Sequence, residues 1–289
     1  VTLDDIKIIN LPPDTSITFK INSQQVYLDA NNDPQAGAQP LTSTRSYARA
    51  NYLSGSTQGF SYCSIRDVSR LVKTYPIVTG ELHHTGNTKY TVDAVSADTG
   101  SHFSFAGWSL IIIYGSPDTA GHYLYLWDEN FAYHPGTGQN LDWDGDGAPG
   151  GDIDGFLFPE PIRNKDGEVI DDVSAKLTCF VVEGDQHWTP DSVEAVGQQT
   201  LVPVTLSNAQ SPANNAWDGL WPHEGTVYEG VDIDTYEILW TDNIFTPKDT
   251  RLTINLNSSQ DSYNLVYLIM SVRSETVTSG TEHYIIDSN

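Results

Sequence analysis

The chain is poor in basic residues: 14 Lys and Arg stand against 38 Asp and Glu, which gives a formal net charge of −24 over 289 residues. A field of this sign repels the phosphate backbone of nucleic acids and the anionic surface of membranes. We therefore expect no nucleic-acid partner. Cations are the natural counterpart, because clustered carboxylates are hard oxygen ligands, although most of the acids need do no more than confer solubility.

Long apolar runs are also absent. The longest, from Leu110 to Tyr114, has the length of a strand, whereas a membrane-spanning helix needs roughly 20 apolar residues. We expect no membrane span. The sequence opens at Val1 without an initiator methionine, which favours a processed chain that is secreted to the extracellular space or the cell surface.

Cysteine is nearly missing, with Cys63 and Cys179 alone. Two thiols are too few for an all-thiolate zinc site. In a secreted chain they favour a disulfide, and closing a loop of about 100 residues would stabilise the fold by roughly 4–5 kcal/mol. Two unrelated free thiols are the alternative.

Strand patterns dominate what is present. Apolar and polar residues alternate over 17–21 and 90–94, and the run 108–114 is continuously apolar, which predicts a central strand covered on both faces. Further strands are expected at 123–127, 175–182, 201–206, 236–240, 251–257 and 263–272.

One short helix is expected over 67–75, where Val68, Leu71, Val72 and Tyr75 recur at helical spacing and Asp67 or Ser64 offers a cap. Together these patterns predict an all-β fold of β-sandwich or jelly-roll architecture with one short helix, with two packed sandwiches as the alternative arrangement. We place a domain boundary near residue 195, giving a large domain 1–195 that carries an acidic loop and a smaller β-domain 196–289.

Several motifs occur in a fixed order over residues 60–275. They are the helix, Gly-Asn-Thr-Lys-Tyr-Thr-Val at 86–92, Ala-Gly-Trp-Ser-Leu-Ile-Ile-Ile-Tyr at 106–114, Asp-Gly-Phe at 154–156, Val-Glu-Gly-Asp at 182–185 and Gly-Val-Asp-Ile-Asp-Thr-Tyr at 230–236. As a series they resemble a family of largely uncharacterised secreted β-domains in the surface proteins of bacteria and archaea. The resemblance implies export, a β-rich fold and a role at the cell surface, and it supplies no catalytic residues.

The segment from Asp142 to Asp154 carries the strongest local motif. Asp142, Asp144 and Asp146 occupy alternate positions and Gly147 follows where a calcium loop turns sharply. Asp152 and Asp154 flank the closing position. We predict a free-standing calcium loop, and a solvated Asp/Gly turn is the alternative.

A second calcium candidate is the segment 29–33, in which Asp29, Asn31 and Asp33 supply oxygen ligands at positions one, three and five. Pro34 occupies the glycine position, so an ordinary Asx turn is favoured there. Asp232 and Asp234 alternate along a strand, and we interpret them as solvated charges.

Tryptophan is the remaining functional signal. Trp143, Trp217 and Trp221 could form an exposed platform that stacks on sugar rings, and burial under loops is the alternative. The eight histidines are scattered and show no zinc spacing. The chain has no Gly-x-Ser-x-Gly elbow and no His-Glu-x-x-His, so we expect no enzyme.

Two functions from different classes remain. The first is an extracellular structural protein that self-associates into a homopolymer, such as a surface filament, sheath or layer, through β-strand pairing and calcium. The second is a calcium-dependent adhesin or carbohydrate-binding module with a glycan partner. Calcium-dependent self-association without sugar would favour the first.

Overall fold

The computed structural model describes most of the chain, namely residues 2–9, 16–21, 23–29, 31, 33–37, 41–43, 45–52, 58–74, 89–93, 95, 106–115, 121–128, 131–133, 141–169, 173–182, 184–219, 230–275 and 285–286. It divides into two compact units, Val1–Ala120 (the N-terminal unit) and Gly121–Asn289 (the C-terminal unit). The division differs from the predicted boundary near residue 195, because the strand Asp191–Gly197 runs through that point and pairs with strands on both of its sides.

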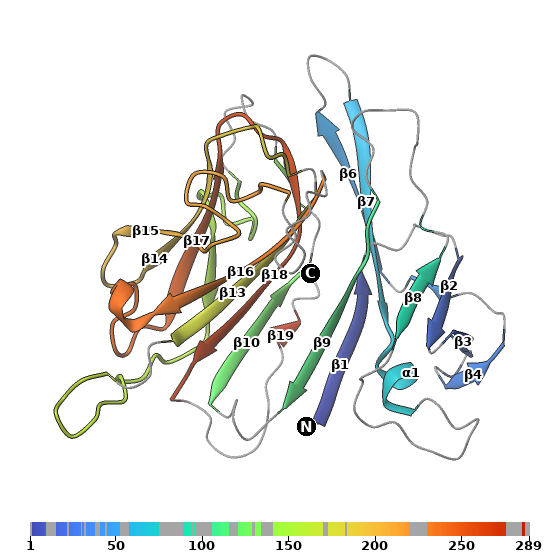
Figure 1. Ribbon diagram of the computed structural model, residues 1–289, viewed down its shortest axis with the longest axis horizontal. Coiled ribbons are helices and arrows are strands. Elements are labelled where there is room, and N and C mark those ends of the chain that lie inside the picture. The colour runs from blue at the N-terminus through green and yellow to red at the C-terminus, as the bar shows by residue number, and fades with distance from the viewer. Residues whose placement is uncertain are drawn as a thin grey trace. The chain divides into compact units, whose positions relative to one another are not determined.

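The all-β prediction is confirmed, and the described residues form four sheets. The strands of the N-terminal unit are β1 (Thr2–Ile9), β2 (Ser16–Ile21), β3 (Gln24–Leu28), β4 (Pro34–Ala36), β5 (Leu41–Thr42), β6 (Arg45–Tyr52), β7 (Gln58–Asp67), β8 (Tyr90–Asp93) and β9 (Ser109–Gly115). One sheet has the order β6-β7-β1-β9, and the other has the order β4-β3-β2-β5 with β8 paired to β2 (Figure 1).

The predicted helix is present as α1 (Ser69–Thr74). The Asp67 carboxylate accepts a hydrogen bond of 2.8 Å from the Ser69 N–H and so satisfies a free donor at the helix start. Val68, Leu71 and Val72 are buried against Phe19 and its neighbours in the core of this unit. None of the helices within the described ranges has the length and apolar character needed to cross a membrane.

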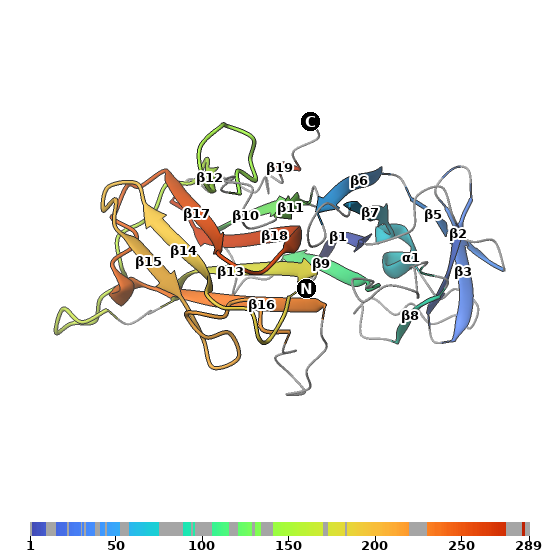
Figure 2. The same ribbon diagram turned by 90° about the horizontal axis from the view of Figure 1, so that it is seen from above.

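The strands of the C-terminal unit are β10 (His122–Trp127), β11 (Phe131–Tyr133), β12 (Gly151–Asp154), β13 (Val173–Val182), β14 (Asp191–Gly197), β15 (Pro203–Leu206), β16 (Val231–Leu239), β17 (Arg251–Ser258), β18 (Tyr263–Arg273) and β19 (Ile285–Ile286), and the 3₁₀ turn η3 (Trp240–Asp242) follows β16. One sheet has the order β16-β13-β18-β10-β19 with β11 paired to β18, and the second has the order β12-β17-β14-β15. Figure 2 shows the two sheets as separate layers.

The core of the C-terminal unit lies between these two sheets. Leu177 of β13 and Met270 of β18 share one buried cluster with Val193 of β14 and Ile254 of β17, so the inward faces of both sheets meet there. This is the face-to-face packing of a β-sandwich.

The predicted disulfide is not formed, and this corrects the sequence-based expectation. Cys63 and Cys179 are both free and both fully buried. Cys63 lies in β7 of the N-terminal unit, whereas Cys179 lies in β13, within the core of the C-terminal unit. Each thiol is therefore a small buried side chain within its own unit.

The run 108–114 forms β9, but the prediction that it is covered on both faces is wrong. The strand lies at the end of its sheet, and Trp108, Ile112 and Tyr114 are 36%, 38% and 51% exposed. A continuous apolar run does not tell which strands will lie beside it.

Candidate functional site

The predicted calcium loop is a compact turn at the entry to β12, and we call residues 142–150 the acidic loop. The Trp143 N–H donates to the Gly150 carbonyl at 3.0 Å, and the Gly150 N–H donates to the Leu141 carbonyl at 2.8 Å. Gly145 and Gly147 have φ of 78° and 88°, in the left-handed region that glycine adopts without a Cβ clash. The loop thus closes at its base and turns back sharply between its acids.

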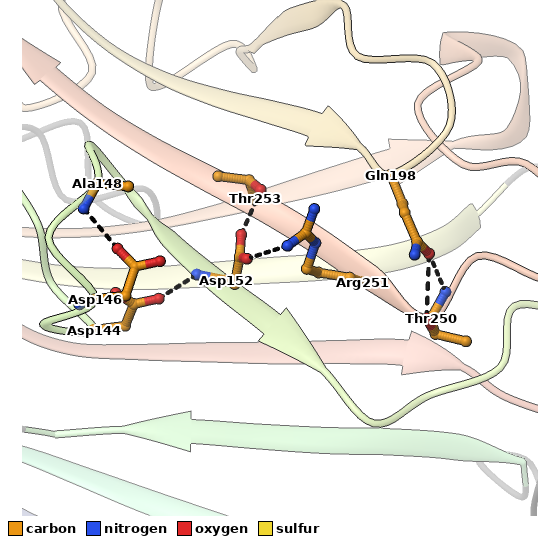
Figure 3. A network of polar contacts seen from close by, with 8 residues as sticks. All are labelled: Asp144, Asp146, Ala148, Asp152, Gln198, Thr250, Arg251 and Thr253. Carbon is orange, nitrogen blue, oxygen red and sulfur yellow. Dashed lines mark hydrogen bonds and ion pairs between the residues drawn. The ribbon is translucent and has the colours of Figure 1, made fainter.

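Backbone amides hold the carboxylates of this loop in place. The Asp142 carboxylate accepts hydrogen bonds from the N–H groups of Gly145 (2.7 Å), Asp146 (3.1 Å) and Gly147 (2.8 Å). The Asp144 carboxylate accepts from the Asp146 and Asp152 N–H groups at 3.1 and 2.7 Å. Asp146 in turn accepts from the Ala148 N–H at 2.7 Å, as Figure 3 shows.

The result is a triad of acidic ligands. One ligand atom from each of Asp142, Asp144 and Asp146 lies within 4.8 Å of the other two, and in the part of the chain that the structure describes this is the one such group. Burial raises the pKa of Asp144, and the neighbouring charge of Asp146 adds to the increase. Carboxylate oxygens gathered on a turn suit a hard divalent cation.

The core of the sandwich fixes the position of the acidic loop. Trp143 lies between two of the acids in sequence, yet its indole is 1% exposed. The indole N–H donates to the Ile254 carbonyl of β17 at 3.0 Å, and the ring packs edge-on against Trp127 with centroids 5.6 Å apart. A Cβ at position 151, directly after the acidic loop, would come within 2.3 Å of this indole, so this position must be glycine. The ligands therefore stand on a buried aromatic anchor.

Asp152 and Asp154 do not join the triad, which corrects the predicted ligand set. The Asp152 carboxylate pairs with the Arg251 guanidinium at 2.9 Å and also accepts a hydrogen bond from the Thr253 hydroxyl (Figure 3). Asp154 is exposed at the end of β12. Asp152 contributes through its N–H, which orients Asp144.

The described residues of the segment 29–33 form an Asx turn. The Asp29 carboxylate accepts hydrogen bonds from the Asn31 and Asp33 N–H groups at 2.8 and 3.0 Å. The carboxylate of Asp33 is paired with the Arg70 guanidinium. Asn31 is exposed. The Asx turn that the sequence favours is thus present, and the pairing of Asp33 with Arg70 leaves the calcium assignment to Asp29, Asn31 and Asp33 without structural support.

The aromatic platform is not formed by the predicted residues. Trp143 and Trp217 are 1% and 0% exposed and belong to the core, so neither offers a ring face to a sugar. Trp221 lies outside the described residues.

Asp232 and Asp234 were predicted to be solvated, and this is also wrong: each is 1% exposed. The signal was present in the sequence. Period-two alternation puts both acids on the same face of β16 as Tyr236 and Ile238, which are apolar enough to mark the inward face.

No family model matches the chain, and no curated protein matches it. Three solved structures of infectious bursal disease virus are similar to it. The Gt strain gives 11% identity over 96% of this chain and 73% of that chain, with a TM-score of 0.24. The Gx strain gives the same identity and coverage with a TM-score of 0.26, and the T=1 particles derived from the virus give 11% over 94% and 69% with a TM-score of 0.24. Similarity at this level carries no argument about function.

Calcium binding at the acidic loop is tested by the double substitution Asp144→Asn and Asp146→Asn. Loss of two anionic ligands is expected to weaken calcium affinity by about 100-fold or more, because ligand charge sets the affinity of such loops. Isothermal titration with calcium measures it. The matched control is Asp166→Asn, an exposed acid on another turn. Unchanged affinity and melting temperature in the double variant would mean that the loop is only a turn.

Proposed function

We propose that this chain is a structural protein of the extracellular surface that self-associates into a homopolymer, such as a filament, sheath or layer, and that calcium promotes the association. The proposal includes secretion and a role that is not enzymatic. The single observation that carries it is the exposed apolar face of β9 at the end of its sheet.

Among the described strands, β9 pairs with β1 and with no strand on its other side. An edge strand presents backbone N–H and C=O groups that another strand can pair with. Natural edge strands are commonly protected by charged side chains, whereas Trp108, Ile112 and Tyr114 are large and apolar here and more than a third exposed. A second copy of the chain that adds a strand at this edge would cover both the backbone groups and these side chains.

Charge explains why calcium enters the proposal. Copies that each carry a formal charge of −24 repel one another. Monovalent salt screens this repulsion only beyond a Debye length of about 8 Å at physiological ionic strength. Calcium bound by the acidic loop removes charge locally and holds the loop in one shape.

The proposal is tested by Ile112→Lys, which places a charge on the exposed face of β9. Analytical ultracentrifugation in calcium is expected to show large species for the parent chain and monomer for the variant. Ile162→Lys is the matched control, because Ile162 is 49% exposed but lies in the loop after β12. A parent chain that stays monomeric with and without calcium would contradict the proposal.

The adhesin alternative lacks a comparable observation. Its aromatic platform required Trp143 and Trp217 to be accessible, and both are buried. We therefore propose no second function.

A further inference from the structure

Four aspartates are buried together at one end of the C-terminal sandwich. They are Asp191 at the start of β14, Asp218 in the loop after β15, and Asp232 and Asp234 on β16, with exposed fractions of 1%, 4%, 1% and 1%. We call this set the core carboxylate cluster. It is separate from the acidic loop, and its four members together form no sequence motif.

The members are close enough to disturb one another electrostatically. Burial raises the pKa of Asp232, and the charge of Asp234 beside it raises it further. Burial likewise raises the pKa of Asp234, to which Asp218 and Asp191 add. Burial also raises the pKa of Asp191 to about 6. Like charges are thus gathered from three separate segments into one place.

Several oxygens in this buried place have no hydrogen-bond partner. The Gly219 N–H donates to Asp232 Oδ2 at 2.9 Å and the Trp217 N–H donates to Asp191 Oδ2 at 3.3 Å, but Oδ1 of both aspartates is unpartnered. Neither carboxylate oxygen of Asp234 makes a hydrogen bond of ordinary geometry with the described residues, although the Asp232 and Ser211 side chains are near enough to shift its pKa. Basic residues within the described ranges form no ion pair with these three aspartates.

A residue bridged to Asp191 carries a further unpartnered oxygen. Asn215, which pairs with Asp191 in an isolated β-bridge, is 8% exposed. Its side-chain amide N–H donates to the Gln186 carbonyl at 3.1 Å, while its Oδ1 has no partner. Leaving buried polar groups unpaired is costly, and a buried charge costs more than a neutral group. A proton shared between Asp232 and Asp234, or a cation bound among these oxygens, would lower this cost.

We infer that the core carboxylate cluster binds a divalent cation of the calcium class, with the carboxylates of Asp191, Asp232 and Asp234 as ligands and with Asp218 and the Asn215 side-chain oxygen beside them. Every available donor is oxygen, and Ca²⁺ accepts six to eight oxygen ligands in irregular arrangements. A cation there would pair the unpartnered oxygens and cancel the repulsion in one step.

The oxygens of the core carboxylate cluster are less closely gathered than those of the acidic loop, because no three of its members bring ligand atoms all within 4.8 Å of one another. A bound Ca²⁺, with Ca–O distances of about 2.3–2.6 Å, would have to draw the carboxylates together. The cation would join β14, β16 and the loop 211–219, which lie far apart in sequence.

The experiment compares two double variants of the full chain, Asp232→Asn with Asp234→Asn (the core variant) and Asp144→Asn with Asp146→Asn (the loop variant). Calcium is the probe, native mass spectrometry counts bound ions, and calorimetry gives the melting temperature in calcium and in chelator. The core variant is expected to bind one calcium fewer than the parent.

The change in melting temperature has an expected direction in each variant. Saturating calcium should raise the melting temperature of the loop variant by about 10 °C at a thousandfold excess over the dissociation constant. The rise should be smaller in the core variant than in the parent, because only the acidic loop then binds calcium. In chelator the core variant should melt above the parent, because it no longer buries like charges. This increase also guards against a variant that merely fails to fold.

The inference is overturned if the core variant binds as many calcium ions as the parent. It is also overturned if the loop variant has the same melting temperature in calcium as in chelator. The core carboxylate cluster is intact in that variant, so this result would mean that the cluster binds only protons. Neither result bears on self-association through β9, so the two proposals fail separately.

Discussion

Replacing Trp143 with alanine is expected to lower the free energy of unfolding of the C-terminal unit by about 3–5 kcal/mol and to weaken calcium binding at the acidic loop. The indole is 1% exposed, so the change leaves a large cavity beside Trp127. It also removes the hydrogen bond to the Ile254 carbonyl. Because Trp143 lies between Asp142 and Asp144 in the sequence, both losses disturb the calcium ligands on either side of it.

The two effects have a common cause. Without the indole, the base of the acidic loop is no longer fixed to β17, and the ligands must be ordered when the cation binds. A loss of this size should lower the melting temperature by about 10 °C.

Calorimetry and calcium titration together measure both effects. Trp188→Ala is the control, because Trp188 is 50% exposed and its truncation removes little buried surface. Equal melting temperatures for Trp143→Ala and the parent would refute the anchoring role.

The second large effect is expected for Gly197→Ala, which should destabilise the C-terminal unit by about 3 kcal/mol or more. Gly197 ends β14 at a tight turn, where its carbonyl accepts a hydrogen bond of 3.1 Å from the Leu201 N–H. An added Cβ would come within 1.8 Å of the Ile244 carbonyl oxygen and 2.7 Å of the Thr200 hydroxyl. The backbone of one segment must move away for a single methyl group to fit.

Gly167→Ala is a matched control that separates space from backbone conformation. Gly167 has a φ of 85° and open space around its Cβ position, so alanine there should cost only about 1 kcal/mol from the left-handed conformation. Urea unfolding of both variants gives the two free energies. If Gly197→Ala costs no more than Gly167→Ala, the close approach to Ile244 is not rigid.

Local features were predictable and long-range features were not. The helix spacing of Val68, Leu71 and Val72 sufficed to place α1 within two residues, because those contacts depend on one short segment. The acidic loop was predictable for the same reason, since the hydrogen bonds to its carboxylates join residues 2 to 8 positions apart.

Predictions failed where the answer depends on distant strands. The apolar run of β9 does not reveal that the strand ends its sheet, because its pairing among the described strands is with β1 alone, which lies far earlier in the sequence. The prediction that Asp232 and Asp234 are solvated rested on their charge and not on their alternation with the apolar residues of β16. Which face of β16 is inward depends on its pairing with β13 and on the loop 211–219, both of which are distant in sequence.

The contact between the Trp143 indole and the Ile254 carbonyl spans 111 residues and bears on the order of events during synthesis. A ribosome adds roughly 5–20 residues per second, so β17 follows the acidic loop by several seconds or more. Until then the loop has acids but no anchor, and β12 has no partner strand in β17. Contacts this far apart in sequence also slow folding, because a long loop must close before they can form. The acidic loop should therefore become competent for calcium only at a late stage, after the last third of the chain has emerged and docked.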